Sequence, residues 1–276
     1  MITRMVTAAA RAILVALLIA MPALALPGVR AESAQVVALL SLAAAMLTFV
    51  EYVSDSPSLI EFRDAAPFNR IRFVALFAIV AMLTLICRGL FYPSPLTETL
   101  SGIGADVGAT MDFPFSPVRL MVLVLPEDAP DRQALLIRAL AGLSYLTSLT
   151  VLVTFVALVR LMDWPIRRGA FNFWVNLPLY DPTAGGDILM RLKRGSHINV
   201  ALGFLLPFLI PAALKAASAY VTPLSPVDPQ TLIWTMAAWA FLPASLIMRG
   251  VALMRIAVLI EEKRRRAYAQ AHVQPA

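Results

Sequence analysis

Six long apolar segments dominate this sequence, and each is long enough to cross a lipid bilayer as a helix. They occupy residues 6–26, 36–53, 71–91, 134–161, 198–214 and 231–248. A helix needs about 20 apolar residues to span the hydrocarbon layer. Because lipid offers no partner to unpaired backbone groups, isolated strands could not replace these helices. The sequence therefore predicts an all-α, polytopic transmembrane bundle that forms a single membrane domain over residues 1–276.

The composition excludes most soluble classes of protein. Hydrophobic residues make up 60% of the chain and charged residues 14%. Soluble domains run at about 45–50% apolar and about 25% charged residues. A soluble enzyme, a nucleic-acid-binding module and a disordered chain are therefore disfavoured.

The distribution of basic residues predicts the orientation of the bundle. Of the 23 lysines and arginines, 17 fall in the N-terminal segment and in 51–72, 160–197 and 249–276. Cytoplasmic loops of membrane proteins carry this excess. We therefore expect both termini to be cytoplasmic, with a periplasmic loop at 92–133, a cytoplasmic interfacial loop at 162–197 and a cytoplasmic basic tail at 249–276. The net charge of +6 then reflects orientation and is no sign of nucleic-acid binding.

The first apolar segment allows two interpretations. Arg4 and Arg11 precede the hydrophobic stretch 12–26, and Ala31 follows it as a site where a signal peptidase could cut. The apolar region of a signal peptide usually stops at 7–15 residues. We favour a retained first span over a cleaved signal peptide because the segment 6–26 is longer than the apolar region of a signal peptide.

The ratio of arginine to lysine indicates the membrane in which the protein resides. Arginine outnumbers lysine 20 to 3, which favours a GC-rich bacterial genome and hence a bacterial inner membrane.

Two loops are long enough to fold. In 92–133, Leu96, Leu100, Ile103 and Val107 repeat at helical spacing, which predicts a short amphipathic helix at the outer interface. Glycines in the same stretch weaken that prediction. In 162–197, aromatic residues stand beside clustered cations, a mixture that suits the headgroup layer. The aromatic residues are Trp164, Phe171, Phe173, Trp174 and Tyr180.

The stock of reactive side chains is small. No aspartate falls in a predicted span, the histidines are His197 and His272, and the cysteine is Cys87. Zinc and haem sites need several histidine or cysteine ligands. We therefore expect no cofactor and no metal, and an enzyme is the least favoured class. Glu51 is the deepest acidic residue, and its position favours a residue at the end of a span.

Two groups of cations are candidate binding sites. The first group, on the predicted cytoplasmic side, would contact anionic lipid or an acidic partner protein, or would simply set the orientation. It comprises Arg167, Arg168, Arg191, Lys193, Arg194, Lys263, Arg264, Arg265 and Arg266. The second group, Arg88, Arg138 and Lys215, would form an outer anion site if three spans pack together. Its alternative is three separate side chains that reach toward outer headgroups.

The fourth span carries the polar stripe of the bilayer region. Ser144, Thr147, Thr150 and Thr154 fall on one side of a helical wheel. They would line a polar path or hydrogen-bond within the helix packing. In the fifth span, Pro207 and Pro211 predict a kink, which suits either a broken transport helix or ordinary packing.

These observations favour a non-catalytic membrane protein. The leading hypothesis is an interaction, assembly or accessory subunit whose partners are the bilayer, anionic lipids at the cytoplasmic face, and a membrane protein or a second copy of the chain. The alternative is a small-solute permease or exporter that uses the polar stripe and the kinked fifth span. A membrane enzyme acting on lipid is less favoured, because it would need His197 or Glu51 beside a nucleophile.

Overall fold

The computed structural model describes residues 2–162, 164–165, 171–180, 187–217 and 228–273, and this part of the chain is helical without strands. The long helices are α1 (Ile2–Ala25), α2 (Ala31–Val53), α3 (Phe68–Gly89), α6 (Asp131–Leu161), α8 (Ile188–Ala217) and α9 (Pro229–Val273). The shorter helices are α4 (Pro95–Met111), α5 (Pro117–Val122) and α7 (Phe173–Asn176). Six of these helices are long and apolar enough to cross a membrane. The predicted all-α transmembrane bundle is confirmed.

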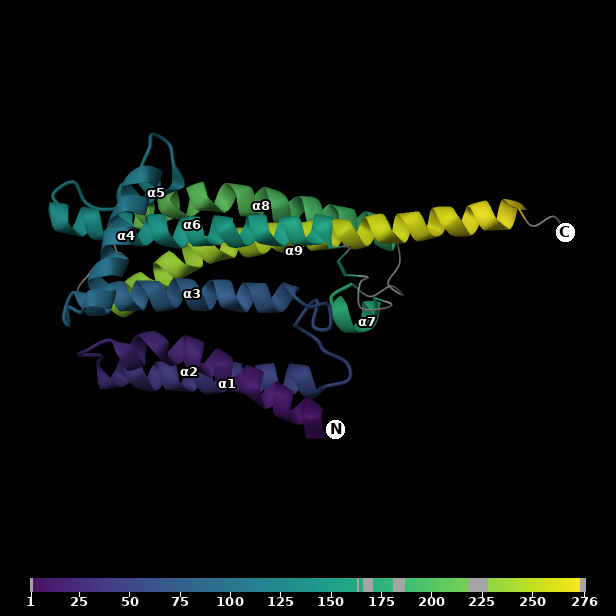
Figure 1. Ribbon diagram of the computed structural model, residues 1–276, viewed down its shortest axis with the longest axis horizontal. Helices are drawn as coiled ribbons and strands as arrows, with labels where there is room; N and C mark the ends of the chain where they lie inside the picture. The colour runs from purple at the N-terminus through teal and green to yellow at the C-terminus, as the bar shows by residue number, and fades with distance from the viewer. Residues whose placement is uncertain (1, 163, 166–170, 181–186, 218–227, 274–276) are drawn as a thin grey trace.

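Both termini lie toward the same end of the bundle (Figure 1). We call this the termini end; it carries residues 54–67, α7 and the far part of α9. The opposite end, which we call the loop end, carries α4, α5 and the turns around them. An even number of spans requires this arrangement. Which end faces the cytoplasm stays a prediction from the charge distribution.

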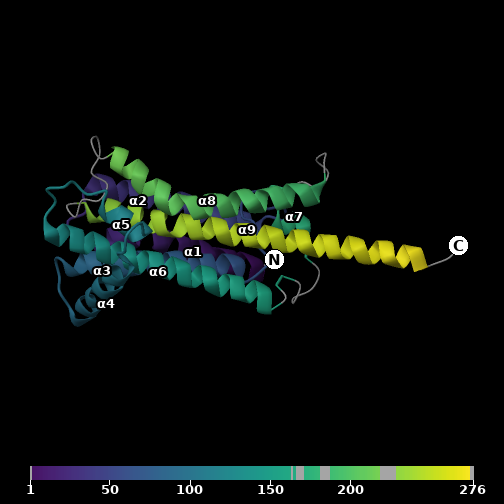
Figure 2. The same cartoon turned by 90° about the horizontal axis from the view of Figure 1, so that it is seen from above.

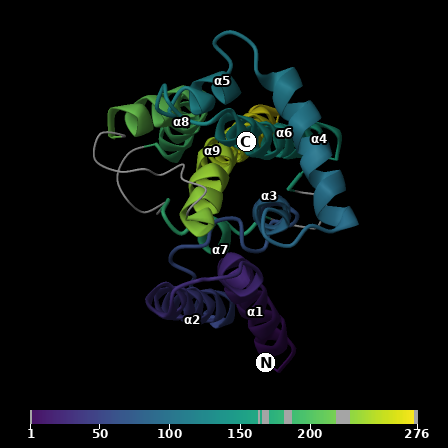
Figure 3. The ribbon, with the colours of Figure 1, turned by 90° about the vertical axis from the view of Figure 1, so that its left-hand side faces the viewer.

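The long helices form two groups. Helices α1 and α2 make a hairpin that lies to one side of α3, α6, α8 and α9 (Figure 3). Among the described helices, α2 packs on α1 alone, whereas α1 also contacts α3 and α9. Only Ser41 and Glu51 of α2 are buried. The hairpin therefore presents most of its surface to lipid.

Two apolar clusters hold the bundle together. The larger cluster joins α3, α5, α6 and α9 and includes Leu83, Met121, Leu140 and Trp239. The second lies at the termini end and includes Phe62, Phe68, Phe155, Trp164 and Leu253. The second cluster gives the termini end a small core of its own, built from the ends of spans and the loops next to them.

Small residues bring α8 and α9 together. A Cβ added at Gly203 would lie 2.6 Å from the carbonyl oxygen of Pro243, and one added at Gly250 would lie 2.9 Å from that of Ser196. The Ser196 hydroxyl donates to the Gly250 carbonyl over 2.7 Å. Close backbone contact and a buried hydroxyl bond are what hold helices together where lipid removes the hydrophobic driving force.

Helix α4 is the predicted helix of the 92–133 loop, and it runs across the bundle at the loop end (Figure 1). Ser94 and Thr97 form a capping box at its start. Two of the glycines that weaken the sequence prediction, Gly104 and Gly108, are contact points with α6. Gly108 approaches α6 so closely that a Cβ on Gly142 would lie 2.5 Å from the Gly108 Cα.

Two helices continue beyond their predicted spans. Helix α8 begins at Ile188, so part of the predicted 162–197 loop is helical. Helix α9 continues through the predicted 249–276 tail as far as Val273. Its far part projects past every other element (Figures 1 and 2).

Candidate functional site

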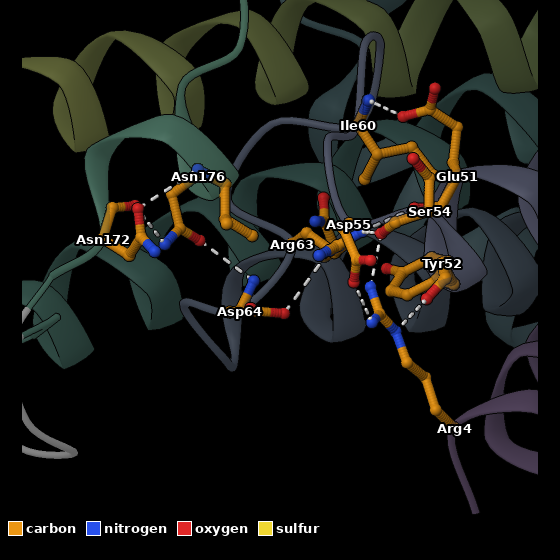
Figure 4. Close-up of polar contacts among 12 residues, drawn as sticks. Arg4, Glu51, Tyr52, Ser54, Asp55, Ile60, Arg63, Asp64, Asn172 and Asn176 are labelled. Atoms are coloured by element: carbon orange, nitrogen blue, oxygen red, sulfur yellow. Dashed lines mark hydrogen bonds and ion pairs between the residues drawn. The ribbon is translucent and has the colours of Figure 1, made fainter. Parts of the chain in front are cut away.

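Polar contacts concentrate at the termini end, beginning with Glu51 in the last turn of α2. Its carboxylate accepts the amides of Ser58, Leu59 and Ile60 at 3.0–3.1 Å, and the Ser58 hydroxyl at 2.6 Å. The residue is 4% exposed. Figure 4 shows the carboxylate turned toward the Ile60 amide. Glu51 therefore anchors the following loop, and its charge is compensated where it stands.

Arg63 caps the end of α2 from that same loop. One terminal nitrogen of its guanidinium donates to the carbonyls of Glu51 and Ser54, both at 2.7 Å. Its Nε lies 3.5 Å from Asp64, and its side chain is 5% exposed. Cations favour the carbonyl end of a helix, where unpaired oxygens gather.

Arg4 reaches the same helix end from α1. It donates to the carbonyls of Tyr52 and Ser54 and pairs with the carboxylate of Asp55 (Figure 4). The Arg4 hydrogen bond holds the pKa of Asp55 below its usual value. Arg4 and Arg63 together fix the α1–α2 hairpin to the loop that leads to α3.

A cleft of about 380 Å³ opens beside these contacts. Its walls come from α1, α2, the loop after α2, and α7. The lining residues are Arg4, Arg11, Tyr52, Asp55, Arg63, Asp64 and Val175. The guanidinium of Arg11 lies 4.3 Å from the centroid of the Tyr52 ring.

Helix α7 closes the loop by backbone contacts. The amide of Phe62 donates to the Asn176 carbonyl over 2.7 Å, and the amide of Asp64 donates to the Asn176 side chain over 2.9 Å. Asn172 caps α7 by accepting the amides of Trp174 and Val175. Figure 4 shows Asn176 facing Asp64, with Asn172 on the other side of Asn176.

The aromatic residues of the predicted interfacial loop divide between packing and exposure. Trp164 is 4% exposed, and its ring lies 5.6 Å from Phe62 and 5.7 Å from Phe155, centroid to centroid. Phe171 joins the same cluster at 6.5 Å from Phe62. Trp174, by contrast, is 60% exposed. The headgroup expectation therefore does not describe Trp164, because Phe62 of the 54–67 loop, Phe68 of α3 and Phe155 of α6 cover its ring.

A bidentate ion pair links this loop to α9. Arg249 donates to both carboxylate oxygens of Glu61, at 2.6 and 2.8 Å. The Glu61 side chain is 8% exposed and that of Arg249 is 25% exposed. Nearby, Arg72 of α3 donates to the Ser245 hydroxyl of α9 over 2.9 Å. This pair of contacts locks α3, α9 and the loop together.

Several predicted lipid- or partner-binding cations are paired within the protein. Lys193 lies 2.9 Å from Glu261, and Arg264 lies 3.1 Å from Asp187. The Arg264 hydrogen bond holds the pKa of Asp187 below its usual value. These contacts brace the start of α8 against the base of the projecting part of α9.

The rest of that predicted group is more open. Arg266 pairs with Glu262 at 3.7 Å along the helix, and its side chain is 80% exposed. Arg191 lies 6.0 Å over the Tyr180 ring. Arg194, Lys263 and Arg265 are exposed. Arg167 and Arg168 lie outside the described residues.

The three predicted outer cations have different surroundings. Arg88 is exposed at the end of α3. Arg138 lies 3.7 Å from Asp112, which also pairs with Arg119 at 3.0 Å. Lys215 donates to the Leu125 carbonyl over 2.9 Å. Two of the three cations are therefore engaged with the loop end of the protein itself, and the shared anion site stays a prediction.

The polar stripe of α6 satisfies its hydroxyls locally. Thr147, Thr150 and Thr154 each donate to the carbonyl four residues earlier, at 2.7–2.9 Å. Ser144 does the same and is buried, whereas Thr150 and Thr154 are exposed. Hydroxyls bonded in this way need no partner from water or solute. This placement favours packing over a polar path.

The remaining candidates for chemistry stand apart from one another. His197 is exposed on α8, and Cys87 is buried in α3. Within the described ranges, no three histidine, cysteine, aspartate or glutamate side chains gather as metal ligands.

No protein-family model, curated protein or solved structure matches this chain. The function must therefore be argued from the residues themselves. Sequence reasoning missed the grouping of Arg4, Arg11, Tyr52 and Arg63 at one cleft, because the contacts join residues far apart in the chain and follow no local period. The signal in the sequence was Arg11, which falls inside the first apolar segment.

Proposed function

We propose that this chain is a non-catalytic inner-membrane protein of bacteria that acts as an assembly or accessory subunit and binds a partner protein through the far part of α9. The observation that carries the proposal is the length of that helix. Helix α9 has 45 residues. At about 1.5 Å per residue it measures about 67 Å, against about 30 Å for the hydrocarbon layer. The helix therefore extends well beyond the membrane.

The projecting segment presents charge on most of its circumference. Burial in α9 ends at Ala257, and residues 263–267 are exposed. Lys263, Arg264, Arg265 and Arg266 follow one another, and successive helical residues are 100° apart. A cationic helix that stands away from the bilayer suits an acidic surface of a partner.

Two ion pairs hold the projecting segment of α9 in a fixed position where it leaves the bundle. The ion pairs Lys193–Glu261 and Arg264–Asp187 hold the segment to α8 where it leaves the bundle. A pre-organised element loses little conformational entropy on binding. The positive-inside distribution puts this end in the cytoplasm, so the partner would be cytoplasmic or would have a cytoplasmic domain.

The alternatives find less support in the same geometry. A permease would use the α6 stripe, whose hydroxyls bond to their own helix. An enzyme acting on lipid would use Glu51 or His197. Glu51 is bound by loop amides, and His197 is exposed.

The proposal is tested by purifying the full chain from its native membrane in mild detergent and weighing the complex by native mass spectrometry. We expect a stoichiometric complex with a second protein species. The double substitution K263E/R266E, which leaves the two basal ion pairs in place, should release the chain alone with an unchanged melting temperature. R88E/R132E makes the same charge change at the loop end and should leave the complex intact. A wild-type chain that is always alone and that moves a solute across liposomes would refute the proposal.

A further inference from the structure

The cleft at the termini end contains a cation whose charge the protein leaves uncompensated. Arg11 lies in α1, inside the first apolar segment. In the part of the chain that the structure describes, no carboxylate pairs with it, and its guanidinium carbon lies 4.3 Å from the centroid of the Tyr52 ring. An ionisable residue within a span is costly and marks a functional site unless its head simply reaches the interface.

Stacking on an aromatic ring uses the face of a guanidinium and leaves its edge available. The five N–H donors of an arginine point outward in the plane of the group. The face of the Tyr52 ring carries no oxygen acceptor, so the N–H donors of Arg11 stay available to a planar or tetrahedral oxyanion. The ring also fixes the orientation of the guanidinium, which lowers the entropy lost on binding.

The other charges of the cleft cancel in pairs. Arg4 is paired with Asp55, and Arg63 with Asp64. Arg4 and Arg63 are also committed to carbonyls at the end of α2. The cleft therefore has a net charge of one positive unit, carried by Arg11. Its volume of about 380 Å³ is within the range of small-molecule sites, about 300–1,000 Å³.

We propose that this cleft binds a phosphate group, with the guanidinium of Arg11 donating to its oxygens from the platform of Tyr52. A phosphodiester carries one negative charge and matches the single uncompensated cation. The cleft lies at the edge of the α1–α2 hairpin, beside apolar residues that are exposed to lipid, including Val6, Leu47 and Val50. This position favours the phosphate of an anionic lipid over a free phosphate ion.

The test uses the full chain in mild detergent, with phosphatidylglycerol as the probe and phosphatidylcholine as the comparison. Native mass spectrometry counts the lipid retained. We expect wild-type protein to retain phosphatidylglycerol selectively and R11Q to bind it about ten-fold more weakly, the effect of losing one charge-assisted contact. R160Q removes an exposed arginine from the same end, in the last turn of α6, and should bind as wild type does.

A second variant keeps Arg11 in place in case R11Q does not fold. Val175 lines the same cleft from α7. V175E adds a carboxylate that neutralises Arg11 and should cause the same loss, whereas V175Q should not. In a further experiment, inorganic phosphate is added to the complex with phosphatidylglycerol. If phosphate displaces the lipid, the site binds a phosphate group whether or not it belongs to a lipid. Failure of phosphate to displace it would support the site with the lipid as its ligand.

Two results would overturn the proposal. The first is wild-type protein that retains the two lipids equally and shows no change in melting temperature with inorganic phosphate. The second is retention of phosphatidylglycerol by both R11Q and V175E at the wild-type level. Arg11 would then be an arginine that only reaches toward the interface. Neither result bears on partner binding by α9, because the two sites share no residue.

Discussion

Trp239 of α9 donates its indole N–H to the carbonyl oxygen of Pro207 in α8 over 3.1 Å. In an unbroken helix that carbonyl would accept the amide of residue 211, four positions later. Residue 211 is proline, which has no amide hydrogen. Trp239 is 1% exposed, so its indole supplies from a neighbouring helix the donor that Pro211 lacks.

We predict that W239F destabilises the protein by about 1–2 kcal/mol, because the Pro207 carbonyl loses its donor in a site without water. Phenylalanine keeps an aromatic ring against Tyr145, whose ring lies 5.5 Å from that of Trp239. Thermal unfolding in mild detergent measures the loss. In a P211A background the helix regains its own amide, so W239F should cost less. An equal cost in both backgrounds would contradict this account.

The sequence was sufficient to predict the membrane spans, but it was not sufficient to predict the packing at the termini end. Long apolar runs predict membrane helices because lipid leaves a backbone few alternatives. The burial of Trp164 could not be predicted in the same way, because aromatic residues next to cations occur both in the headgroup layer and in small folded cores. Glu51 was visible as a residue at the end of a span. Its role as the anchor of Ser58–Ile60 depends on the path of a loop, which no periodicity records.

Two glycines, one in α6 and one in α4, predict opposite effects when they are replaced by alanine. A Cβ on Gly142 of α6 would lie 2.5 Å from the Gly108 Cα, whereas a Cβ on Gly102 would have nothing within 4 Å. G142A should destabilise the protein by about 1–3 kcal/mol, because two backbones must separate. G102A should stabilise it by about 0.5–1 kcal/mol through helix propensity. Melting temperatures that fall together, or rise together, would contradict the close packing of α4 on α6.

Acid should loosen the brace between Asp187 and Arg264. The Arg264 guanidinium and the Leu189 amide hold the pKa of Asp187 below its ordinary value of 3.8. Because the folded pKa is lowered, the contact stabilises the fold at pH values above the ordinary one. That stability is lost as pH falls through the folded pKa. Hydrogen exchange of the first amides of α8, compared between wild type and D187N across this pH range, measures the change.

The D187N comparison separates this contact from general acid effects. In D187N the contact with Arg264 is weakened at every pH. The hydrogen-exchange rates of the first α8 amides should therefore differ between D187N and wild type near neutrality and become equal in acid. A constant difference across the whole range would show that Asp187 acts other than through its charge.

The ion pair between Glu61 and Arg249 should be the costliest of these contacts to break. Its two hydrogen bonds measure 2.6 and 2.8 Å, and the Glu61 side chain is 8% exposed. Arg72 lies close enough to interact electrostatically with both charges. E61Q should cost about 2–3 kcal/mol, below the usual cost of breaking a fully buried pair because Arg249 is partly exposed.

E262Q provides the matched control for E61Q. It removes the same charge from a pair whose arginine, Arg266, is 80% exposed, and it should cost less than about 0.5 kcal/mol. Thermal unfolding of both variants in the same detergent gives the comparison. If E61Q and E262Q cost the same, the Glu61–Arg249 pair does not lock the loop to α9. The aromatic cluster and the hydrogen bonds of Glu51, Arg63 and Asn176 would then hold the termini end.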